Sequence, residues 1–290
     1  MDPEVRDRWR LTVGPQLGAR STYTWAAARD GREYVVQRIN PADSPDWRYS
    51  LRVAAALREQ GWPTPEPAEE PLVTPDGVWL LADRLPGRPH VTAGSDSPAE
   101  QRRRGRLLAE LHAALAATGI TGQREGFGFP AAMVGDPELE RTLRAYRELH
   151  PDDGAELLAC RAAAVEFFAA NPVVEAPSGV IHGDFTPWNL LFENDRLTGV
   201  LDFELTHVSH LVADFALAWR GYQDGVISGY EEVRPLSELE RSLLVPTFQA
   251  WCFLGLAGED AATLDLSWNV AHLRRASTRL IGPPRRRSGR

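Results

Sequence analysis

The stretch GVIHGDFTPWNLLFENDRLTGVLDFE, residues 179–204, carries most of the structural information in this chain. Short apolar runs alternate with polar residues in it, and each run has the length and composition of a β-strand. The apolar runs are Val180–Ile181, Leu190–Phe192 and Leu197–Leu201. The Glu-Asn-Asp-Arg sequence at 193–196 has the residue types of a tight turn, so we expect the last two runs to form a hairpin.

Three polar side chains fall at the ends of these expected strands. They are Asp184, Asn189 five residues later, and Asp202 thirteen residues beyond that. Carboxylate and amide oxygens are hard ligands of the kind that Mg²⁺ prefers. A further carboxylate can accept the proton of a hydroxyl group that attacks a phosphate. The pattern therefore predicts an ATP-dependent phosphotransferase, with Asp184 as the base and with Asn189 and Asp202 as metal ligands.

The motifs HGDFTPWN (182–189) and LDFE (201–204) resemble the catalytic loop and the metal-binding segment of the aminoglycoside phosphotransferase and choline kinase family. The spacing from Asp184 to Asn189 is also that of the HRDxxxxN motif of protein kinases. The resemblance implies an α+β, bilobal, protein-kinase-like fold with a small antiparallel-sheet lobe and a larger, mainly helical lobe. It also implies ATP and Mg²⁺ as cofactors. The alternative, that these residues only satisfy a tight loop, leaves Asp202 unexplained.

Composition indicates an ordinary globular chain of 290 residues, 43% hydrophobic, long enough for one large domain or two lobes. It contains no apolar run of about 18 residues, and the N-terminus MDPEVRDRWR is too polar for a signal peptide, so we expect a cytoplasmic protein without membrane partners. A net charge of −8 disfavours nucleic-acid binding. Cys160 and Cys252 stand in apolar surroundings and predict buried thiols. The sequence does not indicate an oligomeric state.

All 32 basic residues are arginine, so any role that a lysine normally fills must pass to another residue. Residues 10–39 predict three antiparallel strands, with an Asp30-Gly31 pair closing a hairpin. The resemblance places residues 14–23 in the phosphate-covering loop. It places Arg38 where the family has a basic residue that contacts the α- and β-phosphates, a task that a guanidinium can perform. The alternative for Arg38 is a solvated side chain on an exposed strand face.

Residues 44–60 predict a helix with Ser44 as its N-cap and Pro45 in its first turn, ending at Gly61. The family carries a glutamate in this helix, which pairs with the basic strand residue. Its expected position falls near Ser50, where no carboxylate stands. The nearest substitutes are Asp43, Asp46 and Glu59, and the sequence does not choose among them.

We predict a nucleotide-binding lobe at 1–82, a hinge at 83–88, a catalytic and acceptor-binding lobe at 89–282, and a disordered basic tail at 283–290. The hinge resembles the family's inter-lobe linker, whose backbone meets the adenine, so Asp83, Arg84 and Leu85 are assigned to the cofactor site.

In the large lobe, the pattern from Ser97 to Glu100 predicts a helix start, as does the pattern from Ser237 to Glu240. Residues 136–170 predict one or two helices. Asp214 resembles the family's buried aspartate, which accepts backbone N–H groups of the catalytic loop.

We predict transfer of the γ-phosphoryl group to a hydroxyl of a small molecule, an aminoglycoside-like or other natural-product antibiotic, as a resistance or self-protection activity. The net charge and acidic residues of the large lobe favour a cationic or polyhydroxylated acceptor. The acidic residues are Asp152, Asp153, Glu231, Glu232, Glu259 and Asp260. The residues expected to face the acceptor are Glu204, Trp188, Trp219, Tyr222 and Trp251, although core packing is the alternative for most of the aromatic ones.

Two other functions remain open. One is a metabolite kinase that acts on homoserine, choline or an amino sugar. The other, from a different class, is a non-catalytic protein with a kinase fold that binds a nucleotide or ligand. The intact set of Asp184, Asn189 and Asp202 argues against the latter, because such a protein needs neither a base nor metal ligands.

Overall fold

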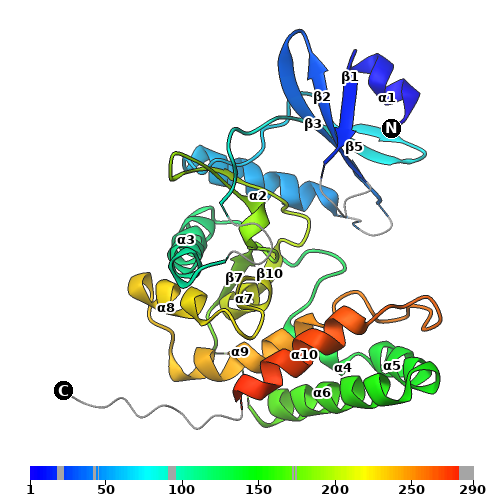
Figure 1. The fold of residues 1–290 in the computed structure, drawn as a ribbon, viewed down its shortest axis with the longest axis vertical. Helices are drawn as coiled ribbons and strands as arrows, with labels where there is room; N and C mark the ends of the chain where they lie inside the picture. Colours follow the sequence, from blue (N-terminus) through cyan, green and yellow to red (C-terminus); the bar gives the residue numbers. More distant parts are fainter. Residues whose placement is uncertain are drawn as a thin grey trace. The chain divides into compact units, whose positions relative to one another are not determined.

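The computed structural model describes residues 1–17, 23–41, 44, 46–90, 96–171, 173 and 175–280, which form two compact units (Figure 1). Unit 1 lies within Met1–Thr92, Arg124–Gly126 and Pro187–Thr206, and unit 2 within the remaining segments. Residues 187–206 thus belong to unit 1, whereas the predicted lobe boundaries place them in the second lobe. The predicted tail at 283–290, most of the predicted phosphate-covering loop, Asp43 and Pro45 lie outside the described residues.

Unit 1 is built on an antiparallel five-stranded sheet with the order β1-β2-β3-β5-β4. Its strands are β1 (Thr12–Gln16), β2 (Thr24–Arg29), β3 (Arg32–Ile39), β4 (Leu72–Thr74) and β5 (Gly77–Asp83). The β2–β3 hairpin turns at Asp30 and Gly31, whose φ angles of 52° and 78° are the left-handed pair of a type I′ turn. The predicted antiparallel strands and their Asp-Gly turn are confirmed.

The two faces of this sheet are covered by different helices, α1 (Pro3–Arg8) and α2 (Trp47–Glu59) (Figure 1). On one face Val36 and Trp79 belong to an apolar cluster with Val5 of α1. On the other face Ile39 packs with Trp47 of α2. Because side chains alternate along a strand, neighbouring residues of β3 have different surroundings.

Helix α2 starts later than expected. Its N-cap position is Asp46, and the side chain of Ser44 accepts a hydrogen bond from Arg124 instead of capping the helix, so the predicted Ser44 cap is wrong. The helix ends as predicted before Gly61, whose φ of +86° a side chain would disfavour.

A second, three-stranded sheet of unit 1 has the order β6-β8-β9. Its elements are β6 (Arg88–Pro89), the short 3₁₀ helix η1 (Pro187–Asn189), β8 (Leu190–Glu193) and β9 (Arg196–Val200). Asn194 and Asp195 form the β8–β9 turn with φ angles of 48° and 62°. Asn and Asp tolerate this conformation better than other side chains do, which confirms the predicted hairpin.

Unit 2 combines a two-stranded antiparallel sheet with helices. Its elements are α3 (Pro98–Ala117), α4 (Pro130–Gly135), α5 (Pro137–Leu149), α6 (Pro151–Ala170), β7 (Ser178–Ile181), β10 (His207–His210), η2 (Leu211–Asp214), α7 (Phe215–Trp219), α8 (Asp224–Val233), α9 (Glu238–Trp251) and α10 (Ser267–Leu280). Ser97 and Ser237 cap α3 and α9 as predicted, and the helical region at 136–170 breaks at His150.

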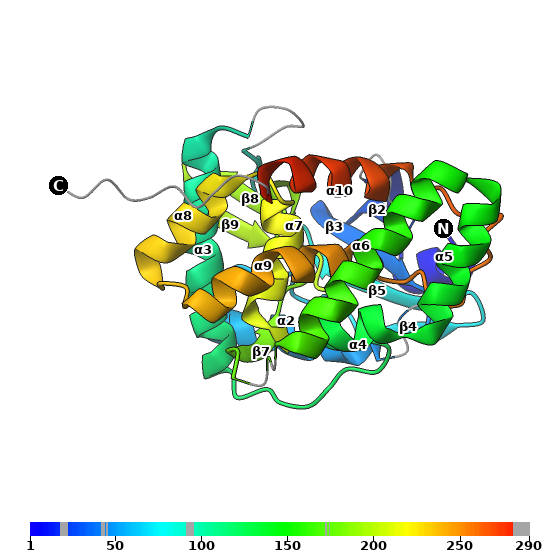
Figure 2. The ribbon, with the colours of Figure 1, turned by 90° about the horizontal axis from the view of Figure 1, so that it is seen from below.

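Helices α3 and α8 lie side by side (Figures 1 and 2). They approach closely because each has a glycine, which carries no side chain, where it faces the other helix. A Cβ atom at Gly229 would lie 1.9 Å from the carbonyl oxygen of Arg102, and one at Gly105 would lie 2.0 Å from that of Val226. This close contact fixes α8 on α3. No helix within the described ranges is both long and apolar enough to cross a membrane.

Candidate active site

The loop that carries Asp184 leaves β7 in unit 2 and is held by a buried carboxylate. Asp214, which is inaccessible to solvent, accepts hydrogen bonds from the backbone N–H groups of His182, at 2.8 Å, and Gly183, at 2.6 Å. Gly183 has a φ of +82°, so the loop turns sharply just before Asp184. The structure thus gives Asp214 the role expected of it, as an acceptor for the loop's backbone.

Asp214 is itself held by a histidine. Nε2 of His112 lies 3.0 Å from the Asp214 carboxylate, and its Nδ1 lies 2.8 Å from the Tyr230 hydroxyl. Burial alone would raise the pKa of Asp214, but the contacts from His112 and the backbone N–H of His182 outweigh it and hold the pKa below its usual value. Asp214 is therefore an ionised, hydrogen-bonded anchor for the loop.

Asp184 is half-buried and is fixed through its backbone. Its N–H donates to Nδ1 of His182 at 3.2 Å, and its carbonyl accepts from the N–H of Thr186 at 2.8 Å. Burial lowers the pKa of the neighbouring Arg220 guanidinium, whereas Tyr222 and the negative charge of Asp184 act in the opposite direction. The carboxylate of Asp184 is thus presented on a constrained loop near a cationic side chain.

Asn189 and Asp202 belong to unit 1, where a backbone contact ties their segments together. The carbonyl of Asn189 accepts the N–H of Leu201 at 2.8 Å, which joins the end of η1 to the residue before Asp202. Asn189 is buried and Asp202 is exposed. The two predicted metal ligands therefore lie on adjoining, hydrogen-bonded segments, and their oxygen atoms suit Mg²⁺.

Asp202 has left-handed backbone geometry, with a φ of +63°. Asp pays a smaller steric penalty there than most residues, but the conformation still costs about 1 kcal/mol and persists only where surrounding contacts impose it. Unlike Asn194 and Asp195, Asp202 does not sit in a two-residue hairpin turn. An outlier at a predicted metal ligand favours a functional reason for this geometry.

Glu204 follows two residues later and contacts the main sheet. Its side chain accepts a hydrogen bond from the Gln37 amide. Glu204 keeps an exposed surface, but the protein around its carboxyl and the charge of Asp202 raise its pKa to about 7, while Arg124 and the Gln37 hydrogen bond act in the opposite direction. Glu204 thus connects the segment after Asp202 to β3.

Arg38 lies on the other face of β3 from Gln37. Its guanidinium stands over the ring of Tyr23, 4.5 Å from the ring centroid, and 6.0 Å from that of Trp79. Gln37 pairs across the sheet with Leu80, on the face covered by α2. This placement does not favour Arg38 as the phosphate contact, and it makes Gln37 the better candidate.

Of the three predicted hinge residues, Asp83 is the last residue of β5, and Arg84 and Leu85 follow it. The backbone N–H of Asp83 donates to the carbonyl of Glu66 at 3.1 Å, and that of Arg84 donates to Glu33 at 3.2 Å. These two groups therefore already have partners within unit 1. Leu85 stays a predicted contact of the adenine.

The aromatic residues expected at the acceptor site have different surroundings. Trp219 is buried, packs edge to face on Phe248 and donates its indole N–H to Asp224, which favours a core role. Tyr222 and Trp251 are half-buried, and Trp188 is exposed in unit 1. Tyr222 lies under the guanidinium of Arg275, 4.1 Å from the ring centroid, and Trp251 packs on Trp268.

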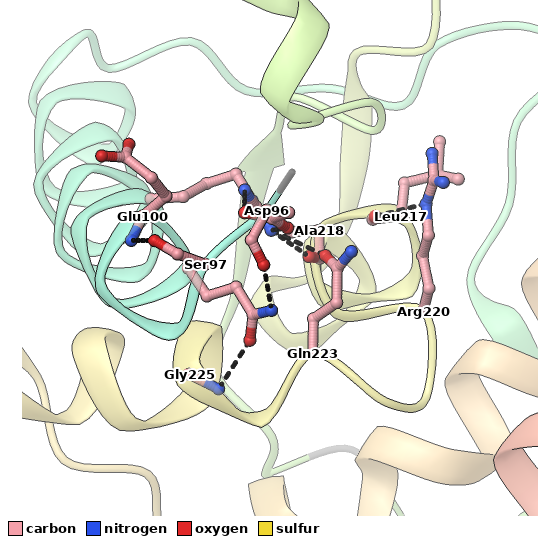
Figure 3. Close-up of polar contacts among 10 residues, drawn as sticks. Asp96, Ser97, Glu100, Leu217, Ala218, Arg220, Gln223 and Gly225 are labelled. Atoms are coloured by element: carbon pink, nitrogen blue, oxygen red, sulfur yellow. Dashed lines mark hydrogen bonds and ion pairs between the residues drawn. The ribbon is translucent and has the colours of Figure 1, made fainter. Parts of the chain in front are cut away.

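A buried ion pair fixes the turn that carries Arg220 and Tyr222. Arg104 of α3 forms two hydrogen bonds with Asp96, at 3.1 and 2.8 Å, and also donates to the Gln223 side chain and the Ala218 carbonyl (Figure 3). The N–H of Gly225 donates to Gln101 in the same cluster. The start of α3 and the α7–α8 turn are thereby joined. Arg220 stands in this turn as the left-handed C-cap residue of α7, with a φ of +54°.

The model of the phosphotransferase enzyme family matches residues 15–242, which is most of the chain. The chain belongs to this family. The match includes every residue to which we assign a part in catalysis, metal binding or nucleotide binding.

Homoserine kinases of several bacteria are similar in sequence to this chain. A homoserine kinase of Gluconacetobacter diazotrophicus is 33% identical over 227 residues, which cover 72% of this chain and 66% of its own length. Homoserine kinases of Gluconobacter oxydans and Xanthobacter autotrophicus are matched over 46% and 45% of their lengths. This chain therefore spans about half to two thirds of these relatives.

Among solved structures, a thermostable mutant of the aminoglycoside phosphotransferase APH(4)-Ia superposes with a TM-score of 0.65 at 17% identity, covering 96% of this chain and 99% of that one. A ternary complex of a related mutant with ADP and hygromycin B superposes with a TM-score of 0.62 at 18% identity, covering 97% and 98%. At these identities the likeness establishes the fold alone. The α+β, kinase-like fold that the sequence predicts is confirmed.

Three residues near the site were not found by sequence reasoning. Gln37 was missed because Val35 and Val36 are both apolar, so the facing of β3 could not be read from alternation. Arg124 stands in a loop between glycines and phenylalanines without a pattern that marks a contact. Arg220 follows an apolar helix and has no motif of its own.

We predict that Asp214→Asn loosens the loop that carries Asp184. Removing a buried charge with several partners should lower the free energy of unfolding by about 2 to 4 kcal/mol at neutral pH. Because the folded pKa lies below the usual value of 3.8, this contribution is fully present above that pH and is lost as the pH falls through the folded pKa. Urea unfolding at several pH values would measure it.

The matched control for this experiment is Asp152→Asn, which changes an exposed aspartate in the first turn of α6. It should alter the free energy of unfolding by less than about 0.5 kcal/mol. An Asp214→Asn protein whose stability deficit stays constant down to acid pH would contradict the ionised anchor.

Proposed function

We propose that this protein transfers the γ-phosphoryl group of ATP to a hydroxyl group of a small molecule. The observation that carries the proposal is that each member of the Asp184, Asn189 and Asp202 set is constrained by its own contacts. A buried carboxylate holds the loop of Asp184, a backbone hydrogen bond joins the segments of the other two, and Asp202 is kept in a strained conformation. Membership of the phosphotransferase enzyme family supports the same reaction.

In this proposal the carboxylate of Asp184, contributed by unit 2, orients the acceptor hydroxyl and takes its proton. The hydroxyl oxygen forms a bond to the γ-phosphorus, and the bond from that phosphorus to the bridging oxygen breaks, which releases ADP. Catalysis of this kind depends on positioning and charge stabilisation more than on covalent chemistry. The fixed backbone around Asp184 suits such a role.

The carboxylate of Asp202 and the side-chain oxygen of Asn189, both contributed by unit 1, would hold Mg²⁺. The bound ion would neutralise the negative charge of the phosphates. Oxygen donors on two hydrogen-bonded segments fit this hard cation. The backbone of Leu85 is our proposed contact for the adenine. ADP is bound in the solved ternary complex that has the same fold, which supports nucleotide use by this protein.

The acceptor is the finer part of the proposal, and we favour a small hydroxyl-bearing metabolite over an antibiotic. Three of the six acidic residues that suggested a cationic acceptor are engaged in ion pairs: Asp153 contacts Arg274, Glu231 contacts Arg241, and Glu232 contacts Arg102 and Arg106. They therefore give little support to recognition of a polycation.

Two further observations bear on the acceptor. The Arg220 guanidinium interacts electrostatically with Asp184, and the guanidinium of Arg275 lies over the Tyr222 ring in the same unit. Such cations suit an acceptor that carries an acidic group, as an amino acid does. The homoserine kinases described above have the higher sequence identity, 33% for the one of Gluconacetobacter diazotrophicus, which agrees with this chemistry, whereas the two solved aminoglycoside phosphotransferase structures described above share 17% and 18% with this chain.

The first test separates the two carboxylates. Asp202→Asn removes a charge that Mg²⁺ needs, so we expect Mg²⁺-dependent ATP binding and turnover to be lost. Asp184→Asn should leave the dissociation constant for MgATP within a few-fold of the wild-type value but slow phosphoryl transfer by about 100-fold or more, as expected for loss of a positioned base. Calorimetry with MgATP and single-turnover rates would measure both effects. Wild-type turnover in Asp184→Asn, or unimpaired Mg²⁺-dependent binding in Asp202→Asn, would contradict the role of that residue.

A second test compares neighbouring residues of β3. Gln37→Ala removes the amide that bonds Glu204, and we expect it to raise the dissociation constant for MgATP about 10-fold, the size of one hydrogen bond to a charged group. Arg38→Ala is the matched variant from the opposite face. It should change that constant by less than about 3-fold while lowering stability by about 1 kcal/mol, through loss of the contacts with Tyr23 and Trp79.

Gln37 and Arg38 are neighbours in β3 and lie on opposite faces of the sheet, so the two variants compare the two faces at one place in the strand. If Arg38→Ala weakens MgATP binding strongly and Gln37→Ala does not, Arg38 is the phosphate contact that the resemblance implied. Thermal unfolding of each variant without nucleotide would separate a binding defect from a folding defect.

A further inference from the structure

Arg124 is a buried arginine that reaches the segment following Asp202. It is 1% exposed, although it stands in the loop between α3 and α4, at a point where the chain enters unit 1 for three residues. Its Nη1 atom donates to the carbonyl oxygens of Glu204 and, at 2.9 Å, Thr206. Its Nη2 atom donates to the hydroxyl of Ser44 at 2.7 Å.

A guanidinium at this depth requires compensation. Burial lowers the pKa of Arg124, while the charges of Asp46 and Glu204 and the nearby Tyr49 act in the opposite direction. An apolar side chain would fill the same space without the free-energy cost of burying a charge. The presence of a guanidinium therefore indicates that the carbonyl groups to which it donates must be held in place.

Those carbonyl groups belong to the turn immediately after Asp202. Asp202 is left-handed, and the segment that follows is fixed from two sides: Arg124 binds its backbone, and Gln37 binds the side chain of Glu204. A strained residue keeps its conformation only when its neighbours over-determine it. The two contacts supply that constraint.

The same arginine also reaches the start of α2. Ser44 lies two residues before the N-cap residue Asp46, and the buried Ser50 occupies the helix position where a carboxylate was expected. The described part of α2 therefore offers no carboxylate at that place. Arg124 provides a different connection, from the residues that precede α2 to the segment that follows Asp202.

We propose that Arg124 is a positioning residue that holds Asp202 in the geometry required to bind Mg²⁺. The inference rests on the proposed function, since it concerns the metal ligand of the same reaction. A purely structural role for Arg124 predicts that substitution lowers stability only. The positioning role also predicts that substitution changes the Mg²⁺ dependence of nucleotide binding.

The experiment measures binding of ATP by calorimetry over a range of Mg²⁺ concentrations. We expect Arg124→Gln to raise the Mg²⁺ concentration at half-maximal binding about 10-fold, since charge-assisted hydrogen bonds to two carbonyl groups are lost. Arg124→Lys keeps the charge but not the planar fork, so its shift should be smaller, about 3-fold. Ser44→Ala keeps both contacts with the turn and should shift the value by less than about 2-fold, because the bond that it removes does not hold the segment after Asp202.

The matched control is Arg161→Gln. Arg161 is also buried, and its hydrogen-bond partners, Glu140 and the carbonyl of Asp136, belong like it to unit 2, whereas Asp202 belongs to unit 1. It should lower the thermal unfolding midpoint without changing the Mg²⁺ dependence of ATP binding. Circular dichroism of each variant would establish that it is folded before binding is measured.

The outcomes separate this inference from the proposed function. A wild-type protein that binds no MgATP contradicts the proposed function itself. A wild-type protein that binds MgATP, together with an Arg124→Gln variant of lower stability but unchanged Mg²⁺ dependence, overturns the role of Arg124. If Arg124→Gln fails to fold, Arg124→Lys decides the matter: an unchanged Mg²⁺ dependence overturns the inference, and a shift supports it.

Discussion

A carboxylate shielded from water is the constraint on which the loop that carries Asp184 depends. Asp214 accepts two backbone N–H groups and the Nε2 atom of His112, and the loop that these bonds hold presents Asp184. Burying a charge is costly unless its partners are in place, so the network tolerates little change. It also extends through Tyr230 to Arg234 and Glu240, which links the loop to the helices of unit 2. The helices of unit 2 thus help to hold the loop that carries Asp184 in place.

The segment after β9 relies on a comparable device in unit 1. Its contacts come from Gln37 and Arg124, which approach Glu204 through its side chain and its backbone. The chain contains no lysine, and the helix position where a carboxylate was expected holds Ser50. A neutral amide and a buried guanidinium therefore stand in the region where the family resemblance implied an ion pair. This arrangement keeps the segment after Asp202 attached to both β3 and the residues that precede α2.

Local signals predicted most of the fold, and non-local contacts account for what they missed. The Asp30-Gly31 turn, the β8–β9 turn and the caps at Ser97 and Ser237 depend on neighbouring residues, and sequence reasoning found them. Ser44 was misplaced because its partner, Arg124, lies 80 residues away in the chain. The facing of Gln37 and Arg38 depends on which helix covers each side of the sheet, which adjacent valines do not reveal. Asp184, Asn189 and Asp202 were found through their spacing, while their catalytic and metal-binding roles stay predictions.

The central claim is the transfer of a phosphoryl group to a small hydroxyl-bearing acceptor. The most direct measurement incubates the protein with ATP labelled in the γ-phosphoryl oxygens, Mg²⁺ and a panel of hydroxy amino acids, amino alcohols, amino sugars and aminoglycosides, followed by mass spectrometry. The account predicts a labelled phosphoryl group on a hydroxyl of at least one small acceptor, with a preference for those that carry an acidic group. Binding of MgATP with no labelled acceptor across the panel, or label found only in inorganic phosphate, would contradict it.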